Sequence, residues 1–268
     1  MTDVLKIEKE TPITWLKLNR PRVLNSLNVE LLNALLNACE ELSKDKETRV
    51  VVITGAGMKT FCAGADLTER KGMTEGQVIG YLSLIQRTMA AIENLPQPVI
   101  AAINGSAFGG GTELALACDL RLMTEEAVLR LTEVKLGIIP GAGGTQRLTR
   151  LIGKSRAKEI ILTARPIGAR EACDIGLVHK LVTAHTNPND EYHNELINQA
   201  RLWAREIATG APLALKSAKF AIDQGSDRDL AAGLALETKA YLQLINTKDR
   251  LEGLVAFAEK REPVYTGE

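Results

Sequence analysis

The chain has 268 residues and carries 33 basic and 33 acidic side chains, so its formal net charge is zero and its pI lies near 6.9. A chain of this length forms one large domain, or one domain with an appended subdomain. Because the charges balance, no general electrostatic attraction to nucleic acid or to a membrane surface is expected.

The cysteine and histidine patterns indicate neither a disulfide framework nor a metal site. The four cysteines are widely spaced and form no C-x-x-C pair, and the sequence contains no H-E-x-x-H motif. Such spacing fits reduced thiols in a cytosolic protein better than disulfides or zinc ligands. The first residues lack an apolar signal core, and no run approaches the roughly 18 apolar residues of a membrane span. We therefore expect a cytoplasmic protein without a metal or a membrane segment.

The first half of the chain alternates between strand patterns and helix patterns. Two alternating segments predict a hairpin, and three later apolar runs predict further strands. Asn28 is expected to cap a helix with an apolar stripe. Thr74 and Gln77 form a capping box at the start of a helix that runs to Asn94. The five expected strands span residues 4–8, 13–18, 49–54, 99–103 and 120–123.

Beyond Arg147 the pattern is mainly helical, with one further strand expected at residues 177–182. Strands alternating with helices, followed by helices alone, indicate an α/β core with a helical appendage. We place the core at residues 1–200 and the C-terminal helical subdomain at 201–268. One expected helix ends at Thr209, the next begins at 210–212, and the last two span 227–245 and 247–260.

Residues 103–119 carry the clearest chemical signal. Three successive glycines separate the strand at 99–103 from compact residues suited to a buried helix, and they leave the backbone N–H groups approachable. The first N–H groups of a helix lack internal partners and carry partial positive charge, so a negative oxygen would be stabilised there. Glu113 follows one turn later, where a buried carboxyl group needs a partner or a function. The alternative interpretation is a packed turn with a solvated glutamate.

Two other stretches share this character. Residues 61–67, Phe-Cys-Ala-Gly-Ala-Asp-Leu, again follow a strand with small residues. Residues 131–147 place Glu133 just before a rigid Pro-Gly loop, although on its own Glu133 is equally consistent with an exposed loop acid. Nucleotide-binding motifs are absent, because Gln146 replaces the last glycine of G-x-G-x-x-G and Leu148 replaces the first glycine of a Walker sequence.

Taken together, these motifs closely resemble the enoyl-CoA hydratase (crotonase) superfamily over nearly the whole chain. The resemblance runs from Asn19-Arg-Pro through the stretch at 61–67 and Asn104-Gly-x-Ala-x-Gly-Gly-Gly-x-Glu-Leu to Ile139-Pro-Gly-Ala-Gly-Gly-Thr-Gln-Arg. Four motifs in this order are far more specific than one glycine cluster. The C-terminal segments, including the closing Lys260-Arg-Glu-Pro-x-Tyr-x-Gly-Glu, look most similar to the 3-methylglutaconyl-CoA hydratases, also described as AU-rich-RNA-binding proteins.

The resemblance implies the crotonase fold, an α/β spiral of ββα units whose C-terminal helices trimerise and cover the active site. The partner would be a second copy of the chain, in a trimer or a dimer of trimers. Ala65 and Gly110 match the positions whose N–H groups form the family's oxyanion hole. Glu113 and Glu133 match the two catalytic glutamates of its hydratases. Superfamily members with other chemistries often lack one of these acids, so their joint presence favours hydration.

The family's coenzyme A contacts can be carried over in the same way. No cofactor is implied, because coenzyme A is part of the substrate. Phe257 and Lys260 match positions that reach the adenine end, often in a neighbouring subunit. Cys62 is interpreted as a packing residue, because no histidine neighbours it in the sequence. The matching substrate- or CoA-binding positions are Arg22, Val23, Leu24, Ala63, Gly64, Asp66, Leu67, Gly141, Phe257 and Lys260.

The chemistry of hydration agrees with these residue types. The thioester carbonyl gathers negative charge as an enolate-like transition state forms, and two fixed N–H donors stabilise it. Water loses a proton as it attacks C3, and C2 gains one, so two carboxyl groups around one water can serve both steps. We assign Glu113 as the base and Glu133 as the acid. The division stays open at this point, because paired acids titrate as a unit.

The sequence thus predicts an enoyl-CoA hydratase, a hydro-lyase, acting on 3-methylglutaconyl-CoA or a short-chain enoyl-CoA in leucine or fatty-acid breakdown. The alternatives are an enoyl-CoA isomerase and an AU-rich-RNA-binding protein. A distal carboxylate would need a cation, for which Arg70 or Lys71 are candidates. RNA binding in the family is associated with a lysine-rich first helix, whereas residues 29–44 contain one lysine and three acids. RNA binding is therefore expected to be weak and to disappear steeply with salt.

Overall fold

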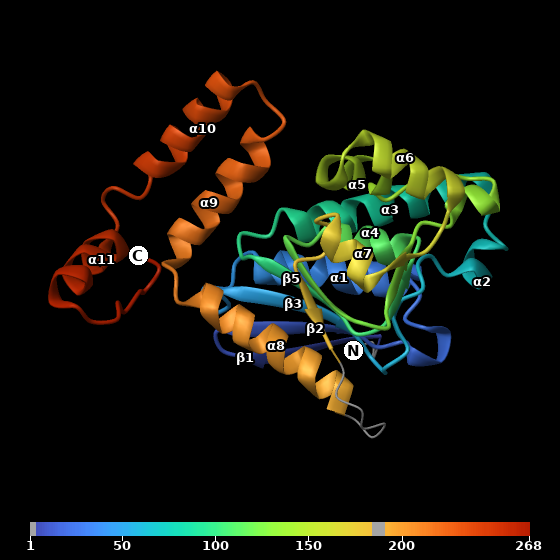
Figure 1. Ribbon diagram of the computed structural model, residues 1–268, viewed down its shortest axis with the longest axis horizontal. Coiled ribbons are helices and arrows are strands. Elements are labelled where there is room, and N and C mark those ends of the chain that lie inside the picture. The colour runs from blue at the N-terminus through green and yellow to red at the C-terminus, as the bar shows by residue number, and fades with distance from the viewer. Residues whose placement is uncertain (1–3, 184–190) are drawn as a thin grey trace.

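The computed structural model describes residues 4–183 and 191–268, and these form an α/β structure built around two sheets (Figure 1). The larger sheet has six strands in the order β1-β2-β3-β5-β7-β10. All of its neighbouring pairs are parallel except the β1–β2 hairpin. Its strands are β1 (Leu5–Glu10), β2 (Ile13–Leu18), β3 (Val50–Gly55), β5 (Val99–Ile103), β7 (Leu120–Thr124) and β10 (Lys180–Val182).

The smaller sheet consists of short strands in the order β4-β6-β8-β9. Three times along the chain, a strand of the larger sheet is followed directly by a strand of the smaller one and then by a helix. This repetition is the ββα spiral that the resemblance implies, and the expected fold class is confirmed. The strands are β4 (Thr60–Cys62), β6 (Ser106–Phe108), β8 (Val128–Arg130) and β9 (Ile167–Gly168).

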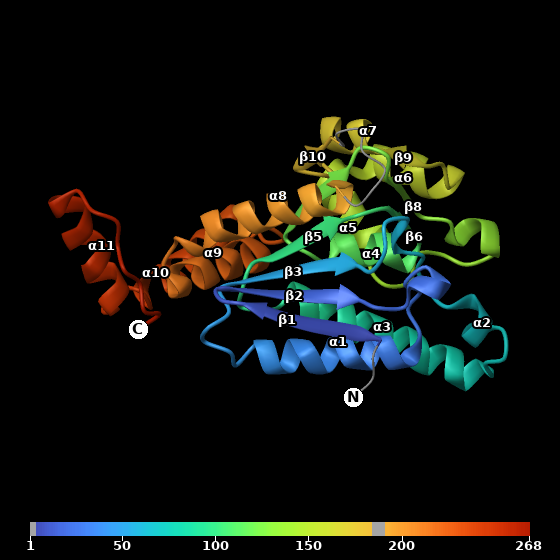
Figure 2. The ribbon, with the colours of Figure 1, turned by 90° about the horizontal axis from the view of Figure 1, so that it is seen from below.

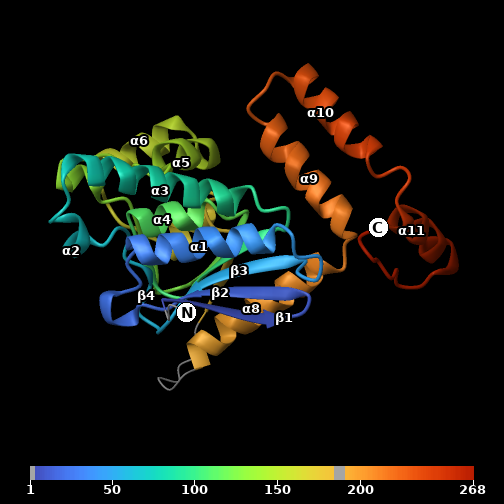
Figure 3. The same ribbon diagram turned by 180° about the vertical axis from the view of Figure 1, so that it is seen from behind.

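The larger sheet is covered by helices on both faces, as Figures 2 and 3 show from two sides. Helices α1 (Val29–Leu42) and α3 (Glu75–Glu93) bury their apolar stripes in the main core on one face. The backbone N–H of Leu31 donates to the Asn28 side chain at 3.0 Å, and the Thr74–Gln77 capping box is present, so both predicted helix starts are confirmed. Helix α8 (Glu191–Ala208) packs against the opposite face.

The charged side chains of α1 bear on the expectation about RNA. The helix ends at Leu42, so the one lysine of the predicted segment lies beyond it. Within the helix the charged residues are Glu30, Glu40 and Glu41, and all three are exposed. An exposed acidic face repels a phosphate backbone, which supports weak RNA binding as a prediction.

Shorter helices complete the core. They are α2 (Leu67–Arg70), α4 (Gly110–Leu116), α5 (Gly144–Ile152), α6 (Lys154–Thr163) and α7 (Ala169–Asp174). The strand predicted at 177–182 begins only at Lys180. Leu177 and Val178 instead donate their N–H groups to the carbonyl of Ala172 at the end of α7, so they terminate that helix before the strand begins.

The last three helices, α9 (Pro212–Gly225), α10 (Leu230–Leu242) and α11 (Lys248–Glu259), extend away from the sheets (Figure 1). The closing segment folds back onto α11, where the buried Asp249 carboxylate accepts the Thr266 and Gly267 N–H groups at 2.7 and 2.9 Å. The boundary expected at residue 200 falls inside α8, whose face is buried on the sheet through Ala208. No helix in the described part of the chain is long and apolar enough to cross a membrane.

Candidate active site

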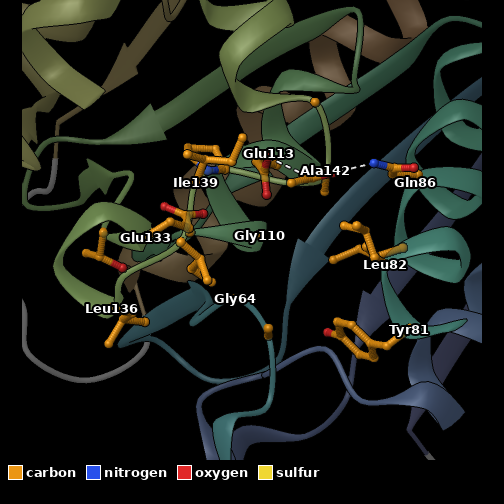
Figure 4. A pocket seen from close by; sticks show the side chains of 18 of the residues that line it. Gly64, Tyr81, Leu82, Gln86, Gly110, Glu113, Glu133, Leu136, Ile139 and Ala142 are labelled. Atoms are coloured by element: carbon orange, nitrogen blue, oxygen red, sulfur yellow. Dashed lines mark hydrogen bonds between the residues drawn. The ribbon is translucent and has the colours of Figure 1, made fainter. Parts of the chain in front are cut away.

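Most of the residues that line a cavity of about 690 Å³ come from four segments (Figure 4). They are the loop after β4, the first turn of α4, one face of α3, and the 3-10 turn Glu133–Leu136 with the loop that follows it. The cavity brings together residues that lie up to about 80 positions apart in the sequence. Of the residues singled out from the sequence, it is lined by Ala63, Gly64, Ala65, Leu67, Gly110, Glu113, Glu133 and Gly141.

The loop after β4 and the start of α4 approach each other through bare backbone. Gly64 has a φ of +86°, and a Cβ there would lie 2.5 Å from the Phe108 carbonyl oxygen and 3.0 Å from the Gly110 nitrogen. Only glycine therefore permits this approach. A Cβ built at Gly110 would lie 3.6 Å from the Ala65 nitrogen. Within the described chain, neither the Ala65 nor the Gly110 N–H group has a protein acceptor, so both remain free to donate to a ligand.

Glu113 is nearly completely buried one turn into α4, with 2 % of its surface exposed. Its Oε1 accepts hydrogen bonds from the N–H groups of Ala142 and Gly144, at 2.8 and 2.7 Å. The pKa of Glu113 is raised to about 7, chiefly by burial and also by the nearby Glu133, against the opposing effect of those N–H donors. Such a carboxyl group exchanges protons near neutral pH.

Glu133 opens the 3-10 turn and is also buried, with 7 % of its surface exposed. Its side chain faces the start of α4, because Oε1 lies 3.1 Å from where a Cβ on Gly109 would stand. Its Oε2 is buried and has no hydrogen-bond partner among the residues that the structure describes. Burial raises the pKa of Glu133 above its ordinary value. A buried carboxyl oxygen without a donor favours the protonated form, which can give a proton to a ligand.

Comparisons with known proteins agree with this geometry. A family model for enoyl-CoA hydratase/isomerase matches residues 8–268. The chain belongs to the enoyl-CoA hydratase/isomerase family. It is 53% identical to YngF of Bacillus subtilis over 264 residues, which are 98% of either chain. It is 46% identical to the mitochondrial methylglutaconyl-CoA hydratase of Homo sapiens over 261 residues, which are 97% of this chain and 76% of that protein.

A solved structure gives the same relationship. The crystal structure of an enoyl-CoA hydratase from Bacillus anthracis superposes with a TM-score of 0.94 at 52% sequence identity, and the match covers 99% of this chain and 100% of that one. The homology confirms the predicted family and makes the chain an enzyme of the hydratase type, a hydro-lyase. The relatives include both bacterial and mitochondrial proteins, so the expected cytoplasmic location stays a prediction.

The two loops that resemble the family's CoA contacts lie side by side. The Ala63 N–H group donates to the Leu24 carbonyl at 3.0 Å, and Leu27 pairs with Ala65 through a parallel bridge. Arg22, Val23 and Leu24 are exposed next to the cavity's loop rather than lining the cavity itself. This enoyl-CoA hydratase/isomerase therefore presents three exposed side chains beside the free N–H groups.

The Asp66 side chain is held by hydrogen bonds that could not be predicted from its position in the motif. Its carboxylate accepts from Arg20 at 3.0 Å and from Ser26 at 3.1 Å, and it caps α2. Although burial opposes ionisation, these donors hold the pKa of Asp66 below its ordinary value. The side chain is thus occupied in joining the two loops, so the structure assigns Asp66 a structural role there.

Phe257 and Lys260 lie outside the cavity of their own chain. Both are near the end of α11, in the helical part that extends away from the sheets (Figure 1). Phe257 is 86 % exposed, which is unusual for a large aromatic side chain in a single folded chain. The structure therefore does not bring these two residues to the site, and their expected role in binding the adenine end would require a neighbouring subunit.

Sequence reasoning missed the wall that faces the two acids. It consists of apolar side chains from α3, such as Tyr81, Leu82 and Ile85, and from the loop containing Ile138 and Ile139. Leu82 and Ile139 are 41 % and 68 % exposed, so they border the cavity rather than the core. The available signal was an excess of apolar residues on α3 beyond one stripe. These extra apolar residues could not be assigned to the cavity without knowing which face of α3 lies opposite the glycine loops.

Cys62 lies beneath the site without taking part in it. Its side chain is fully buried, and burial raises the pKa of its thiol to about 12. A thiol that stays protonated at neutral pH is a poor nucleophile. All four cysteines have free thiols, which agrees with the interpretation of Cys62 as a packing residue.

Proposed function

We propose that this protein catalyses the reversible addition of water across the C2=C3 bond of an enoyl-CoA thioester. The observation that carries the proposal is the pair of buried glutamates, Glu113 and Glu133, bordering the same cavity as two unbonded backbone N–H groups. Acid and base groups beside an oxyanion hole are what the hydration of a conjugated thioester requires.

The reaction follows from these positions. The thioester oxygen accepts hydrogen bonds from the Ala65 and Gly110 N–H groups, which stabilise the enolate as it forms. Glu113 takes a proton from water while the water oxygen bonds to C3. The electron pair of the double bond moves toward the thioester, and Glu133 protonates C2. One proton then returns from Glu113 to Glu133 before the next turnover.

The hydrogen bonds of the two acids support this division of roles. Two N–H groups hold Oε1 of Glu113, and such donors favour the carboxylate that a base must be. Oε2 of Glu133 accepts no hydrogen bond from the described residues, which together with burial favours the protonated form that an acid must be, against the smaller opposing effect of the Thr132 and Glu133 backbone N–H groups. The interpretation with Glu113 as the base and Glu133 as the acid is thus supported by local contacts.

The cavity suggests which acyl groups are accepted. Its wall is largely apolar, which suits a short or branched acyl chain. Among the described residues that line it, Arg70 is the one cation, stacked over the Tyr81 ring at 5.6 Å. Lys71, the other cation considered for a distal carboxylate, does not line the cavity. We propose 3-methylglutaconyl-CoA or a short-chain enoyl-CoA as the substrate, in leucine or fatty-acid breakdown.

Hydration rates over a panel of thioesters test this proposal. We expect the purified protein to hydrate crotonyl-CoA, 3-methylglutaconyl-CoA or both. A preference for 3-methylglutaconyl-CoA should fall in Arg70→Met, while the rate with crotonyl-CoA stays near the parent value. Shifting of a double bond in a 3-enoyl-CoA without hydration of any 2-enoyl-CoA would contradict the proposal and favour an isomerase.

We further propose that the C-terminal helices join copies of the chain into a trimer or a dimer of trimers. Large apolar side chains on these helices are exposed, among them Leu230 at 78 % and Phe257 at 86 %. Exposed apolar surface of this kind is typical of protein interfaces. Light scattering should give three or six times the 29.1 kDa of one chain. A monomer at micromolar concentration would contradict this assembly.

A further inference from the structure

The loop at 140–144 determines how Glu113 is held. Its Ala142 and Gly144 N–H groups both donate to Oε1 of Glu113. Oε2 accepts no hydrogen bond from the described chain and belongs to a residue that lines the cavity. The two oxygens of the Glu113 carboxyl group therefore differ: Oε1 is held by the loop, and Oε2 is left for a ligand or water (Figure 4).

This loop leads into the first residue of α5 and is also held by side chains on both sides. On one side the Gln86 amide donates to the Gly141 carbonyl at 2.8 Å. On the other side, Nη1 of Arg147 donates to the Ala142 carbonyl at 2.9 Å. Gly143 has a φ of +106°, and a Cβ there would collide with the Arg147 guanidinium. The loop conformation thus makes room for Arg147.

Arg147 is itself fixed by an ion pair. Its Nε and Nη2 donate to the two carboxylate oxygens of Glu93 at 2.8 and 2.6 Å. The guanidinium is mostly buried, with 17 % of its side chain exposed. A bidentate ion pair of this kind fixes the plane of the guanidinium, and Nη1 then points toward the loop.

We propose that Arg147 is a positioning residue for the reaction: held by Glu93, it fixes the loop at 140–144 so that this loop orients the Glu113 carboxyl group. The role rests on the proposed hydration, in which Glu113 is the base. Arg147 is not among the residues that line the cavity. It acts through the Ala142 carbonyl, whose residue also provides an N–H donor to Glu113.

The same contact affects when Glu113 gives up its proton. The charged groups that act on Glu113 are Glu133, which raises its pKa, and Arg147, which lowers it. Loss of Arg147 removes a favourable charge and loosens two N–H donors to the carboxylate. Both effects disfavour the ionised form of Glu113. The proton of Glu113 should therefore be lost at higher pH when Arg147 is replaced.

Arg147→Met tests the proposal, with Arg150→Met as the matched control. Both arginines lie on α5, but Arg150 pairs with Asp227 and donates to Gln146 of its own helix, and none of its contacts within the described chain is with residues 140–144. We expect Arg147→Met to lower kcat by about 10- to 100-fold, as misplaced catalytic groups do. The acidic limb of its kcat–pH profile should move to higher pH. Arg150→Met should match the parent in both measurements.

Glu93→Gln provides an independent test if Arg147→Met does not fold. It keeps the positive charge of Arg147 but weakens the pair that aims it. We expect kcat to fall and the acidic limb to move to higher pH by less than in Arg147→Met, because the N–H donors are loosened while the charge of Arg147 is kept. A kcat equal to that of the parent in Glu93→Gln, or in folded Arg147→Met, would overturn the proposal. So would an equal loss in Arg150→Met.

A measurement without substrate separates this proposal from the proposed function. The Glu113 carboxyl carbon can be titrated by NMR in protein labelled with 13C-glutamate, with its signal assigned by its absence in Glu113→Gln. We expect its titration midpoint to rise in Arg147→Met and to stay unchanged in Arg150→Met. This result can be obtained even if the parent hydrates no enoyl-CoA. An unchanged midpoint in Arg147→Met would overturn the link between Arg147 and Glu113.

Discussion

Glu113→Gln is expected to lower kcat for enoyl-CoA hydration by about 10²- to 10⁴-fold, the usual contribution of a general acid or base. The amide oxygen of glutamine can still accept the Ala142 and Gly144 N–H groups that hold Oε1. The loop should therefore stay in place, and only the ability to take a proton is lost. Steady-state kinetics and the binding of a saturated acyl-CoA, measured on the same preparation, separate these effects.

Glu133→Gln should give a loss of similar size for a different reason. The amide cannot give a proton to C2, although it occupies the same buried space beside Gly109. In both variants KM should change much less than kcat, because neither carboxyl group is needed to bind coenzyme A. Near-parent turnover in either variant would show that its carboxyl group has no role in proton transfer.

Stability measurements provide a control that does not depend on activity. The pKa of Glu113 is raised from 4.5 to about 7 in the folded protein, so the folded state holds this proton more tightly than the unfolded state does. The contribution of this proton to the free energy of unfolding is fully present below about pH 4.5. It is lost as the pH rises through about 7. Glu113→Gln should flatten the decline in unfolding free energy over that range, which denaturant titrations can measure. An unchanged decline would contradict the raised pKa.

Sequence patterns predicted the larger sheet much better than the smaller one. The continuous apolar run of β3, buried at every residue, is recognisable without any partner. Strands β4, β6 and β8 have three residues each, and β9 has two, which is too short for periodicity to appear. They exist because neighbouring ββα units bring them together. The sequence therefore predicts no strand between residues 103 and 109, although β6 lies there.

The candidate site shows the same division. Glu113, Glu133 and the glycine loops could be found from the sequence, because bare backbone and an acid among small residues are local features. The contacts of Arg147 and Gln86 join positions more than 50 residues apart, and no local pattern indicates them. Phe257 and Lys260 illustrate a further limit, because both are exposed and lie outside the cavity of their own chain, so their predicted role in binding the adenine end stays a prediction.

Replacement of Gly110 should have the second large effect, through the position of one N–H donor rather than through a side chain. Gly110→Ala is expected to lower kcat by about 10²- to 10³-fold, which is typical for the loss of one oxyanion donor. The added Cβ would stand 3.6 Å from the Ala65 nitrogen, the second donor of the proposed oxyanion hole, and so would narrow the space expected for the thioester oxygen. Gly110→Val should abolish measurable turnover, because its methyl groups would fill that space.

The surroundings of Gly110 indicate that the alanine variant will fold. A Cβ there would lie 3.4 Å from the terminal methyl groups of Ile85 and Leu27, close but within reach of small side-chain shifts. Gly111, the next residue, provides the contrast, since a Cβ on it would collide with the Cys62 carbonyl. Gly111→Ala should therefore lower the melting midpoint and the activity together, whereas Gly76→Ala, on the open face of α3, should change neither.

Circular dichroism, the melting midpoint and kcat measured on the same samples distinguish a donor from a packing residue. If Gly110 provides an oxyanion donor, Gly110→Ala keeps a melting midpoint close to that of the parent and loses turnover. If Gly110 serves packing alone, its variants behave like Gly111→Ala, and activity falls only as far as the folded fraction does. A fully active Gly110→Val would also remove Gly110 from the oxyanion hole, because no thioester oxygen could then lie against its N–H group.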